Sequence, residues 1–469
     1  MSHTRPEKNP IYWFYGSASV SFGIKNNAFS YLLLIYSTQV LGIPGYLAAL
    51  ALAVAMAWDA VSDLFLGHWS DKTQSRLGRR HPFMYAGFIM LPLSFYALFN
   101  PVIELTDVNS WGYLLITAIL IRTAVTLVEV PSVALLPDLV KDYDERNKWL
   151  VLRHAFAWYG GNGIHVINMA FWVGAFGVAS QAGYSIYGIV GALIIAASIL
   201  ISSLGTQKVA SAMPQPSEPF RFKEIWYEIK QIAQSVRNAN FFWLFVYSLI
   251  VGAAGGMSTA LYLYNVTYFF AFTGPQIAIT GVFVFASPAV AYFLAPALGS
   301  RLGKKRAAVV ALLGAIFLYP IPYLLTLAGY WPESGSWNSL IMYSFFVMTE
   351  VIGFIVGGVM LDSMMADVVE DSEVQTSRRS EGLFYAARSF ASKAVSALGI
   401  ILAGSIVSLV GMDGIKGVAD MTDVMRGDLA SFFLPAYCGL YFFAIYLISK
   451  YKIDREQHKT NLEALARKQ

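Results

Sequence analysis

Hydrophobic residues recur along this chain in long blocks that are separated by short polar segments. About twelve blocks reach the roughly 20 residues that a helix needs to cross about 30 Å of hydrocarbon. Backbone polar groups find no partner in hydrocarbon, so each block is expected to be a helix. The pattern therefore predicts an all-α membrane protein with twelve transmembrane helices. The predicted helices start near residues 12, 44, 82, 111, 150 and 184, and then near 240, 275, 306, 338, 380 and 428.

Composition supports this interpretation. Of the 469 residues, 57% are hydrophobic and only 13% are charged, and the mean hydropathy is +0.54, which is too apolar for a water-soluble globule. The single cysteine, Cys438, excludes an internal disulfide. The polar start MSHTRPEKNP lacks a cleavable secretory pattern, so the first apolar block is expected to remain as a membrane crossing.

Positive charge follows the predicted topology. If both termini are cytoplasmic, most of the 33 Lys and Arg residues fall in cytoplasmic segments, and Lys416 and Arg426 fall in external loops. The net charge of +4 is then explained by orientation in the membrane and does not indicate a nucleic-acid partner. We expect a multi-pass plasma-membrane protein with both termini in the cytoplasm.

A polar insert divides the chain near its middle. Residues 206–239 combine Pro-rich spacing with an amphipathic basic helix and are expected to be a cytoplasmic linker. The linker separates an N-terminal six-helix bundle, 1–205, from a C-terminal six-helix bundle with a cytoplasmic tail, 240–469.

The two halves also share a weak sequence echo. LGHWSDKTQSRLGRRHPFM and LGSRLGKKRAAV each place Gly and then basic residues between the second and third helix of a half. The echo favours two parallel repeats with a site near the bilayer midplane. The alternative is convergence, because any short cytoplasmic loop favours Gly, Arg and Lys.

Ionisable residues lie inside the predicted spans. Each costs about 2.5 to 3.5 kcal/mol at a helix centre, so such residues normally face a cavity and a partner. An inert anchor would not need them. The carboxylates are Asp59, Asp63, Glu129, Glu350 and Asp362, and the cations are Lys25, Arg122, Arg153, Arg388 and Lys393.

The acids form a predicted cluster. Asp59 and Asp63 are four residues apart, and Thr126 and Glu129 are three apart, so each pair shares a helix face. Crowded carboxylates require either a proton on one of them or a cation between them, and oxygen ligands suit a hard cation such as Na⁺. The cluster is a candidate Na⁺ or H⁺ coupling site. The alternative is a structural ion pair with Lys393 or Arg153.

The cations predict a different ligand. Arg presents a planar fork to carboxylate, sulfate or phosphate, so several inward cations favour an anionic or polyhydroxy solute. For Lys25 and Arg122 the alternative is that the side chains extend towards a membrane interface. Most aromatic residues are interpreted as packing or interface residues.

Three segments resemble one known family. WDAVSD with GHWSDKTQSRLGRRHP, VPSVALLPDLVKDYDERNKWLVLRHAFA, and DVVEDSEVQTSRRSEGLFYAARSFASKAVSALG are similar to the glycoside-pentoside-hexuronide cation symporters. The resemblance covers nearly the whole chain. It implies a major facilitator superfamily fold with two pseudo-symmetric six-helix bundles, in a bacterial inner membrane, and a secondary transporter.

The resemblance also implies residue roles. Asp59, Asp63, Thr126 and Glu129 match the sodium site of the melibiose permease, a member of this family, while Arg153 and Lys393 match residues of its sugar site. We therefore expect Lys25, Arg122, Arg153, Arg388 and Lys393 to bind solute. A cytoplasmic gate is implied at Asp71, Arg79, Arg80, Asp367, Glu370, Arg379 and Glu381.

Some positions depart from the family pattern. Phe22 and Gly23 stand where the melibiose permease has a Lys-Asp pair that grips galactoside, Arg388 replaces a Gln, and Arg122 has no obvious counterpart. The loss of an acid and the gain of cations make a galactoside doubtful and favour anions.

The resulting expectation is a secondary symporter, driven by Na⁺ or H⁺, of a sugar-like and acidic solute such as a hexuronide. A lysolipid or lipid transporter of the same family is the alternative. An enzyme or channel is not expected, because HExxH and GxSxG motifs are absent and His154 and His165 stand alone. We expect a monomer in contact with membrane lipid, with no cofactor beyond the coupling cation and no nucleic-acid partner.

Overall fold

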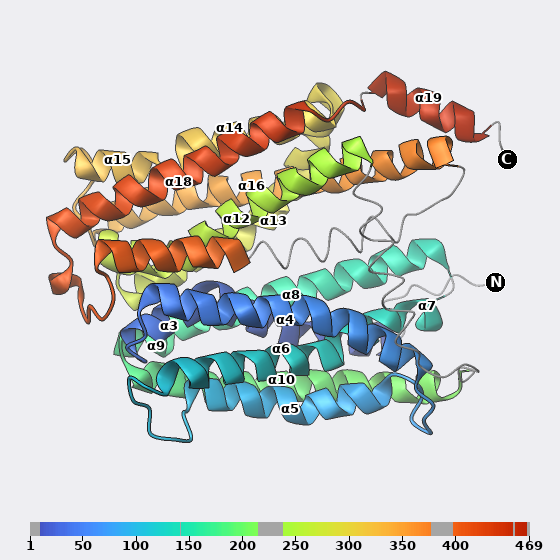
Figure 1. Ribbon diagram of the computed structural model, residues 1–469, viewed down its shortest axis with the longest axis horizontal. Coiled ribbons are helices and arrows are strands. Elements are labelled where there is room, and N and C mark those ends of the chain that lie inside the picture. The colour runs from blue at the N-terminus through green and yellow to red at the C-terminus, as the bar shows by residue number, and fades with distance from the viewer. Residues whose placement is uncertain (1–9, 141, 214–237, 377–396, 454, 467–469) are drawn as a thin grey trace. The chain divides into compact units, whose positions relative to one another are not determined.

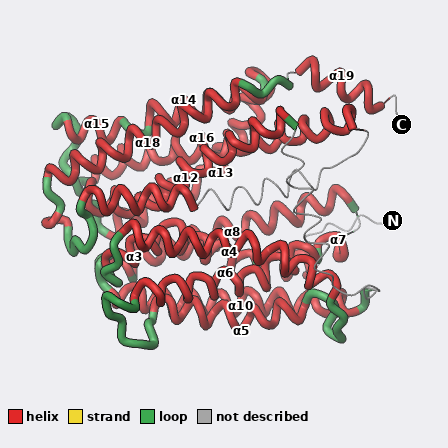
Figure 2. The backbone as a smooth tube through the Cα atoms, viewed as in Figure 1, coloured by secondary structure: helices red, strands yellow, loops and turns green. Residues whose placement is uncertain are grey.

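The computed structural model describes all residues except 1–9, 141, 214–237, 377–396, 454 and 467–469. The described residues form helices and connecting loops, with no strand among them (Figure 2). Nine helices of this described part are long and apolar enough to cross a membrane, which agrees with the predicted all-α membrane architecture. These spans are Gly45–Lys72, His81–Phe99, Ser110–Leu139, Gln181–Ser211, Ala239–Phe269, Gly274–Leu302, Lys304–Leu327, Trp337–Val374 and Asp423–Ser449.

The chain divides into two compact units. The N-terminal unit comprises Met1–Ile225, Thr273–Gly281 and Asp413–Gly417, and the C-terminal unit comprises the rest. The main division, after Ile225, falls inside the polar insert 206–239.

The N-terminal unit is a bundle in which α5 lies against α6 and α10, α4 lies against α6, and α2 lies against α8 (Figure 1). Its elements are α1 Pro10–Ser17, α2 Ser19–Asn27, η2 Ala28–Leu32, α3 Leu33–Gln39, α4 Gly45–Lys72, α5 His81–Phe99, α6 Ser110–Ala134, α7 Leu136–Leu139, α8 Tyr143–Phe171, α9 Val173–Phe176 and α10 Gln181–Ser211.

The C-terminal unit is a second bundle, in which α14 lies against α16 and α12 lies against α18. The first residues of α13 belong to the N-terminal unit. Its elements are α12 Ala239–Tyr264, η3 Asn265–Phe269, α13 Gly274–Leu302, α14 Lys304–Leu318, α15 Ile321–Leu327, α16 Trp337–Thr376, a helix at Ala397–Val410, η4 Val418–Asp420, α18 Asp423–Ser449 and α19 Arg455–Ala466.

Most helices begin within a few residues of their predicted starts. An exception is α8, which begins at Tyr143 instead of near residue 150. Asp142 explains the earlier start, because its Oδ1 accepts a hydrogen bond from the Glu145 backbone nitrogen at 2.9 Å and so caps the helix. The predicted start near residue 380 lies outside the described residues.

The loops that carry the sequence echo share a backbone feature. Gly78, before α5, has φ +89°, and Gly303, before α14, has φ +79°. Both values lie in the left-handed region, which a side chain disfavours and glycine allows. In each unit the glycine therefore turns the chain sharply just before two basic residues.

Each unit also has a π-helical turn early in its chain. One is η2, which follows Asn27, and the other is η3, which begins at Asn265. The Oδ1 atoms of Asn27 and Asn265 are buried and lack a hydrogen-bond partner within the described structure. π-turns often accompany functional positions, and these two give the units a second shared feature.

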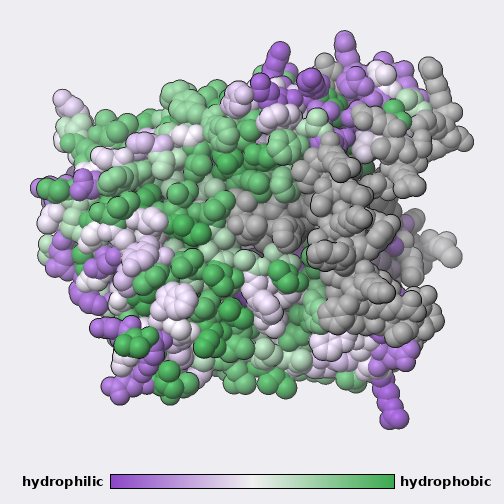
Figure 3. All heavy atoms as spheres, viewed as in Figure 1, coloured by the Kyte–Doolittle hydropathy of each residue, from purple (hydrophilic) through white to green (hydrophobic). Residues whose placement is uncertain are grey.

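The outer surface of the spans is apolar. Figure 3 shows hydrophobic side chains over the middle of the visible face, while hydrophilic ones gather towards the helix ends. Large apolar side chains on these helices are exposed, as expected where a helix meets lipid acyl chains. They include Ile89, Leu93, Ile116, Leu193 and Phe293.

Candidate functional site

The acidic cluster predicted from the sequence is centred on Asp59 of α4. Its side chain is buried, and Thr126 of α6 donates a hydrogen bond from Oγ1 to Asp59 Oδ1 at 3.4 Å. The hydroxyl groups of Ser62 and Thr126 also lie 3.3 Å apart and share a hydrogen bond. Asp63 and Glu129 are half-buried. The structure thus brings α4 and α6 together through Asp59 and Thr126.

Arg122 lies inside this acidic cluster. Its Nη1 is 3.3 Å from Asp59 Oδ2, and the two side chains are only 7% and 3% exposed. The guanidinium carbon stands 4.2 Å from the centre of the Phe29 ring. The negative charges of Asp59, Glu129 and Asp63 all act on this guanidinium. Arg122, assigned from the sequence to the solute, is therefore the buried counter-charge of the first acid.

The acidic cluster offers oxygen ligands of the type that a sodium ion needs, but the surroundings of Asp59 are unfavourable for the ion. Its carboxylate and hydroxyl oxygens are the donor types that a hard cation prefers. However, Asp59 accepts one N–H from Arg122 and one O–H from Thr126, so both of its oxygens have donors. A metal ion bound at Asp59 would also meet the fixed positive charge of the guanidinium. The residues present do not fit a sodium ion at Asp59.

Arg153 of α8 forms a second buried cationic site. Its Nη1 donates to Ser132 Oγ at 3.2 Å. The guanidinium carbon lies 5.1 Å from the centre of the Tyr15 ring and 5.3 Å from that of Phe22. Within the described residues no carboxylate pairs with Arg153. The site is thus a cation held by two rings and a hydroxyl.

Phe22 and Gly23, two of the positions that depart from the family pattern, have structural roles here. Phe22 supplies one of the rings beside Arg153. Gly23 lies where α2 touches α8, and a Cβ added there would lie 2.8 Å from the Gly161 nitrogen. A side chain at Gly23 would push the two helices apart, which explains physically why no acid stands at this position.

The other cations predicted to bind solute are located only in part. Lys25 is buried in α2. Arg388 and Lys393 lie outside the described residues. Their predicted roles remain predictions.

Glu350 of α16 is a half-buried acid inside a spanning helix of the C-terminal unit. Its Oε1 accepts hydrogen bonds from Ser258 Oγ at 3.2 Å and from the Tyr437 hydroxyl at 3.3 Å. The Ser258 hydroxyl oxygen also lies 3.3 Å from the Tyr319 hydroxyl, which in turn bonds to the Tyr323 hydroxyl. The acid therefore sits in a network of hydroxyl groups.

The predicted cytoplasmic gate residues of the N-terminal unit form one network. Arg80 Nη2 pairs with Asp71 Oδ1 at 2.9 Å, and its Nη1 contacts Asp138 and the Ala134 carbonyl. Arg79 Nη2 pairs with the same Asp138 at 2.8 Å. Both basic residues that follow Gly78 thus bind Asp138 in α7, at the end of the span Ser110–Leu139.

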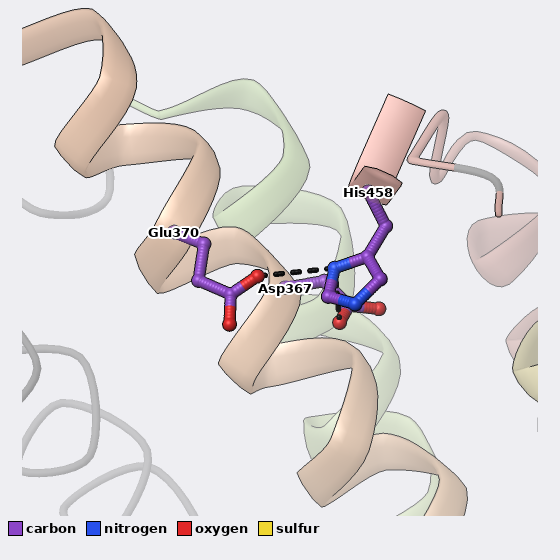
Figure 4. Close-up of side chains that lie close together, drawn as sticks. All are labelled: Asp367, Glu370 and His458. Atoms are coloured by element: carbon purple, nitrogen blue, oxygen red, sulfur yellow. Dashed lines mark ion pairs between the residues drawn. The ribbon is translucent and has the colours of Figure 1, made fainter. Parts of the chain in front are cut away.

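The gate residues of the C-terminal unit form a separate network (Figure 4). Asp367 Oδ1 pairs with Lys304 Nζ at 2.6 Å and lies 3.3 Å from His458 Nδ1. Glu370 Oε2 lies 3.0 Å from the same His458 nitrogen. Arg379 and Glu381 lie outside the described residues. A basic residue after Gly303 thus binds an acid of α16, much as Arg79 binds Asp138 in the other unit.

Two further contacts hold this second network. The Tyr451 hydroxyl donates to Asp367 Oδ2 at 3.4 Å, and burial together with the nearby Asp367 charge raises the pKa of Tyr451. Asn461 Nδ2 donates to Asp371 Oδ1 at 3.2 Å. One ligand atom each from Asp367, Glu370 and His458 lies within 4.8 Å of the others, a spacing compatible with a metal ion. Lys304 already neutralises Asp367.

Sequence reasoning missed several members of these networks. Asp138, Lys304 and His458 were not predicted as partners, and neither were the rings of Tyr15 and Phe22. Lys304 had a visible signal, because it follows the glycine of the echo segment LGSRLGKKRAAV. Asp138 and His458 gave no such signal, since their partners come from helices that meet only in the folded chain.

Apolar spanning helices with buried charged clusters define a multi-pass membrane protein built around internal polar sites. A family model described as "MFS/sugar transport protein" matches residues 14–455. The chain belongs to this family of major facilitator superfamily transporters, and the expected resemblance to glycoside-type symporters is confirmed. The protein is a transporter rather than an enzyme.

Curated relatives support the same class. An uncharacterized symporter of Synechocystis is 35% identical over 159 residues, which cover 33% of this chain and 29% of that protein. The glucuronide carrier protein homolog of Escherichia coli is 25% identical and the match covers 91% of this chain and 89% of that protein. The sodium-dependent lysophosphatidylcholine symporter 1 of Gallus gallus is 23% identical, with 93% and 85% covered.

Solved structures support the fold. The crystal structure of the nucleoside transporter NupG matches with a TM-score of 0.61 at 14% identity, and the match covers 96% of this chain and 100% of that one. Together with the family match, this likeness confirms the predicted major facilitator superfamily fold.

Proposed function

We propose that this protein is a cation-coupled symporter of a sugar-like, acidic solute. The observation that carries the proposal is the buried charge in the spanning helices of the N-terminal unit, where Asp59 pairs with Arg122 beside Thr126. Burying an ion pair costs desolvation free energy, and a helix that only anchors a protein in the membrane does not need a buried ion pair. A transporter needs such groups, because charge on the acids controls what the neighbouring cations can bind.

Arg153 supports the acidic nature of the solute. Its side chain is buried, and within the described residues its partners are two rings and the Ser132 hydroxyl, not a carboxylate. A buried guanidinium of this kind binds a carboxylate or phosphate well, because charged hydrogen bonds are strong where water is excluded. The full-length match to a glucuronide carrier homolog agrees with a uronide-type solute.

The proposed mechanism is electrostatic coupling within an alternating-access transporter. A positive charge gained by the acidic cluster weakens the hold of the carboxylates on the other predicted solute-binding cations, while Arg122 stays paired with Asp59. These cations then bind an anionic solute more strongly, and the bound anion in turn favours the positive charge at the cluster. The gate networks of Asp71, Arg79 and Arg80 and of Asp367 and Glu370 are proposed to stabilise particular conformations of the cytoplasmic ends.

We further propose that the protein works as a monomer in a bacterial inner membrane with both termini in the cytoplasm. The charge distribution along the sequence supports this orientation.

A second candidate is a lysolipid symporter, which the match to the lysophosphatidylcholine symporter of Gallus gallus favours. A zwitterionic or anionic head group would bind the same cations. The difference lies in the solute's tail, since a lysolipid carries a long acyl chain and a uronide does not.

The test is uptake by proteoliposomes that contain the full-length protein. A glucuronide, a neutral glycoside and lysophosphatidylcholine are each supplied with an imposed Na⁺ gradient or with an imposed proton gradient. The proposal predicts accumulation of the glucuronide above equilibrium with one of the gradients. Accumulation of lysophosphatidylcholine alone would favour the second candidate, and equilibration of every solute without accumulation would reject coupled transport.

Arg153→Gln makes this test specific. Losing a charged hydrogen-bond donor to the anion should reduce apparent affinity for the glucuronide by roughly 10- to 100-fold. Arg301→Gln is the matched control, because Arg301 is exposed at the end of α13. Equal affinity in Arg153→Gln and Arg301→Gln would remove Arg153 from the solute site.

A further inference from the structure

We propose that Arg122 is a built-in cation that takes the place of a metal ion at Asp59, so that Na⁺ does not bind at this acid in the native protein. This inference deepens the proposed function and rests on it. It makes Arg122 the residue that determines which cation the acidic cluster accepts. Neither the family match nor the relatives assign such a role.

The first support is the geometry around Asp59. Arg122 Nη1 faces Oδ2 at 3.3 Å, and Thr126 Oγ1 faces Oδ1 at 3.4 Å. Thr126 Oγ1 also lies 3.0 Å from the Arg122 carbonyl oxygen, so its single hydroxyl proton is shared between the two acceptors. A hard cation requires several oxygen atoms whose lone pairs point towards it. Two of those oxygens, on Asp59, are instead turned to the guanidinium and the hydroxyl.

The second support is that the guanidinium cannot easily leave. Arginine stays protonated in proteins, so Arg122 cannot release Asp59 by losing its charge. The side chain is buried, and the Phe29 ring lies against it at 4.2 Å. Separating the pair would leave two buried charges without compensation. A competing Na⁺ would therefore have to displace a positive charge that is held in place.

The third support is the position of Arg122 relative to the other acids. Besides Asp59, the charges of Glu129 and Asp63 act on it. The guanidinium pairs directly with Asp59 on the helix face that α6 shares with Thr126, and Glu129 lies seven residues further along the same helix.

A fourth observation concerns the Nε–H group of Arg122, which donates no hydrogen bond within the described structure. Arg122 Nε is buried and has no hydrogen-bond acceptor among the described residues. A side chain kept only to join helices would be expected to use its buried donors. The contact with Asp59 involves a single N–H, so what the arginine supplies here is mainly charge.

The test measures Na⁺ binding directly. Purified full-length protein is heated in detergent while NaCl replaces choline chloride at constant ionic strength, so that only ion-specific stabilisation is recorded. A ligand that binds only the folded state raises the unfolding temperature as its concentration passes the dissociation constant, and about 100 mM Na⁺ is a sufficient upper limit. The native protein should show no Na⁺-specific shift that Asp59→Asn removes, and Arg122→Gln should gain one that depends on Asp59.

Two control variants define the result. Arg122→Lys keeps a positive charge and should stay insensitive to Na⁺. Asp59→Asn added to Arg122→Gln removes the acid and should abolish the gained response. We expect Arg122→Gln to bind Na⁺ at least roughly tenfold more tightly than Arg122→Lys, the factor that corresponds to about one charged contact.

The inference is overturned if the native protein is stabilised by Na⁺ and Asp59→Asn removes that stabilisation. This arm decides the question even if Arg122→Gln does not fold. An Arg122→Gln protein that folds but gains no Na⁺ response also overturns it. Failure of the proposed function is seen elsewhere, because coupled uptake by proteoliposomes would then be missing under every gradient while the Na⁺-binding result still stood.

Discussion

A single contact, between Asp59 and Arg122, organises the polar interior of the N-terminal unit. The pair links α4 to α6, and it is closed off from solvent. Neither member is stable alone in such surroundings, because an unpaired buried charge loses hydration without gaining a partner. Stability and cation binding are therefore coupled at this position.

This coupling predicts the outcome of neutralising one partner. Asp59→Asn should lower the free energy of unfolding by about 3 to 5 kcal/mol, because Arg122 loses its buried counter-charge. Asp59→Asn combined with Arg122→Gln should recover much of this loss, since neither member of the pair then carries a charge. Thermal unfolding in detergent measures both changes.

Asp107→Asn, in an exposed loop, serves as the control for the loss of one negative charge. If the double variant unfolded at a temperature equal to or below that of Asp59→Asn, the pair would not be the source of the stability difference.

At the residue scale, the sequence predicted that α4 and α6 meet through acids and Thr126, but it did not predict that Arg122 pairs with Asp59. The spacing of Asp59 and Asp63, and of Thr126 and Glu129, identified residues whose helices do meet. Arg122 is four residues before Thr126, so it shares that face of α6. Its pairing with Asp59 was not predicted, because spacing along one helix does not tell which face of the neighbouring helix a residue meets, and its role in solute binding stays a prediction.

At the scale of elements, each unit uses a basic residue after a left-handed glycine to bind an acid near the end of another helix. In the N-terminal unit Arg80 joins Asp71 at the end of α4 to Asp138 in α7. In the C-terminal unit Lys304 at the start of α14 holds Asp367 of α16. In each unit, the basic residue after the glycine thus joins the start of one helix to an acid of another helix.

Arg80 is the residue on which this arrangement depends in the N-terminal unit. Arg80→Ala should lower both stability and uptake, because it leaves the exposed Asp71 and the half-buried Asp138 without a shared cation. We expect a destabilisation of about 2 to 4 kcal/mol, within the range for breaking a partly buried ion-pair network. Thermal unfolding and uptake are measured together.

Arg76→Ala is the matched control, because Arg76 is in the same loop and is exposed. Similar losses in both variants would show that loop charge in general, rather than the contacts of Arg80, supports the fold.

Helix positions were predictable because bilayer thickness imposes a minimum length on every apolar block. The starts of α4, α5, α6 and α12 agree with the predicted ones within a few residues. The partners Asp138 and His458 were not predictable in this way. They lie on short or amphipathic helices whose contacts depend on packing, and packing leaves no periodic signal in the sequence.

At the scale of the whole molecule, the charge distribution predicts orientation in the membrane. Val108, in the exposed loop between α5 and α6, should face the outside, and Lys459, on α19, should face the cytoplasm. In a Cys438→Ala background, Val108→Cys should react with a membrane-impermeant maleimide on intact cells, and Lys459→Cys should react only after the cells are opened.

Labelling of Lys459→Cys on intact cells, with Val108→Cys protected, would reverse the predicted topology. The Cys438→Ala protein without an added cysteine is the blank, since Cys438 is the only native thiol.

The length of α16 has a mechanical consequence. The helix runs unbroken from Trp337 to Thr376, 40 residues. At about 1.5 Å per residue it is about 60 Å long, roughly twice the hydrocarbon thickness of a bilayer. Because the helix is so long, a tilt of about 10° about its middle would move each of its ends by about 5 Å. Asp367 and Asp371, which hold Lys304 and the α19 residue Asn461, lie on the arm that amplifies such a tilt.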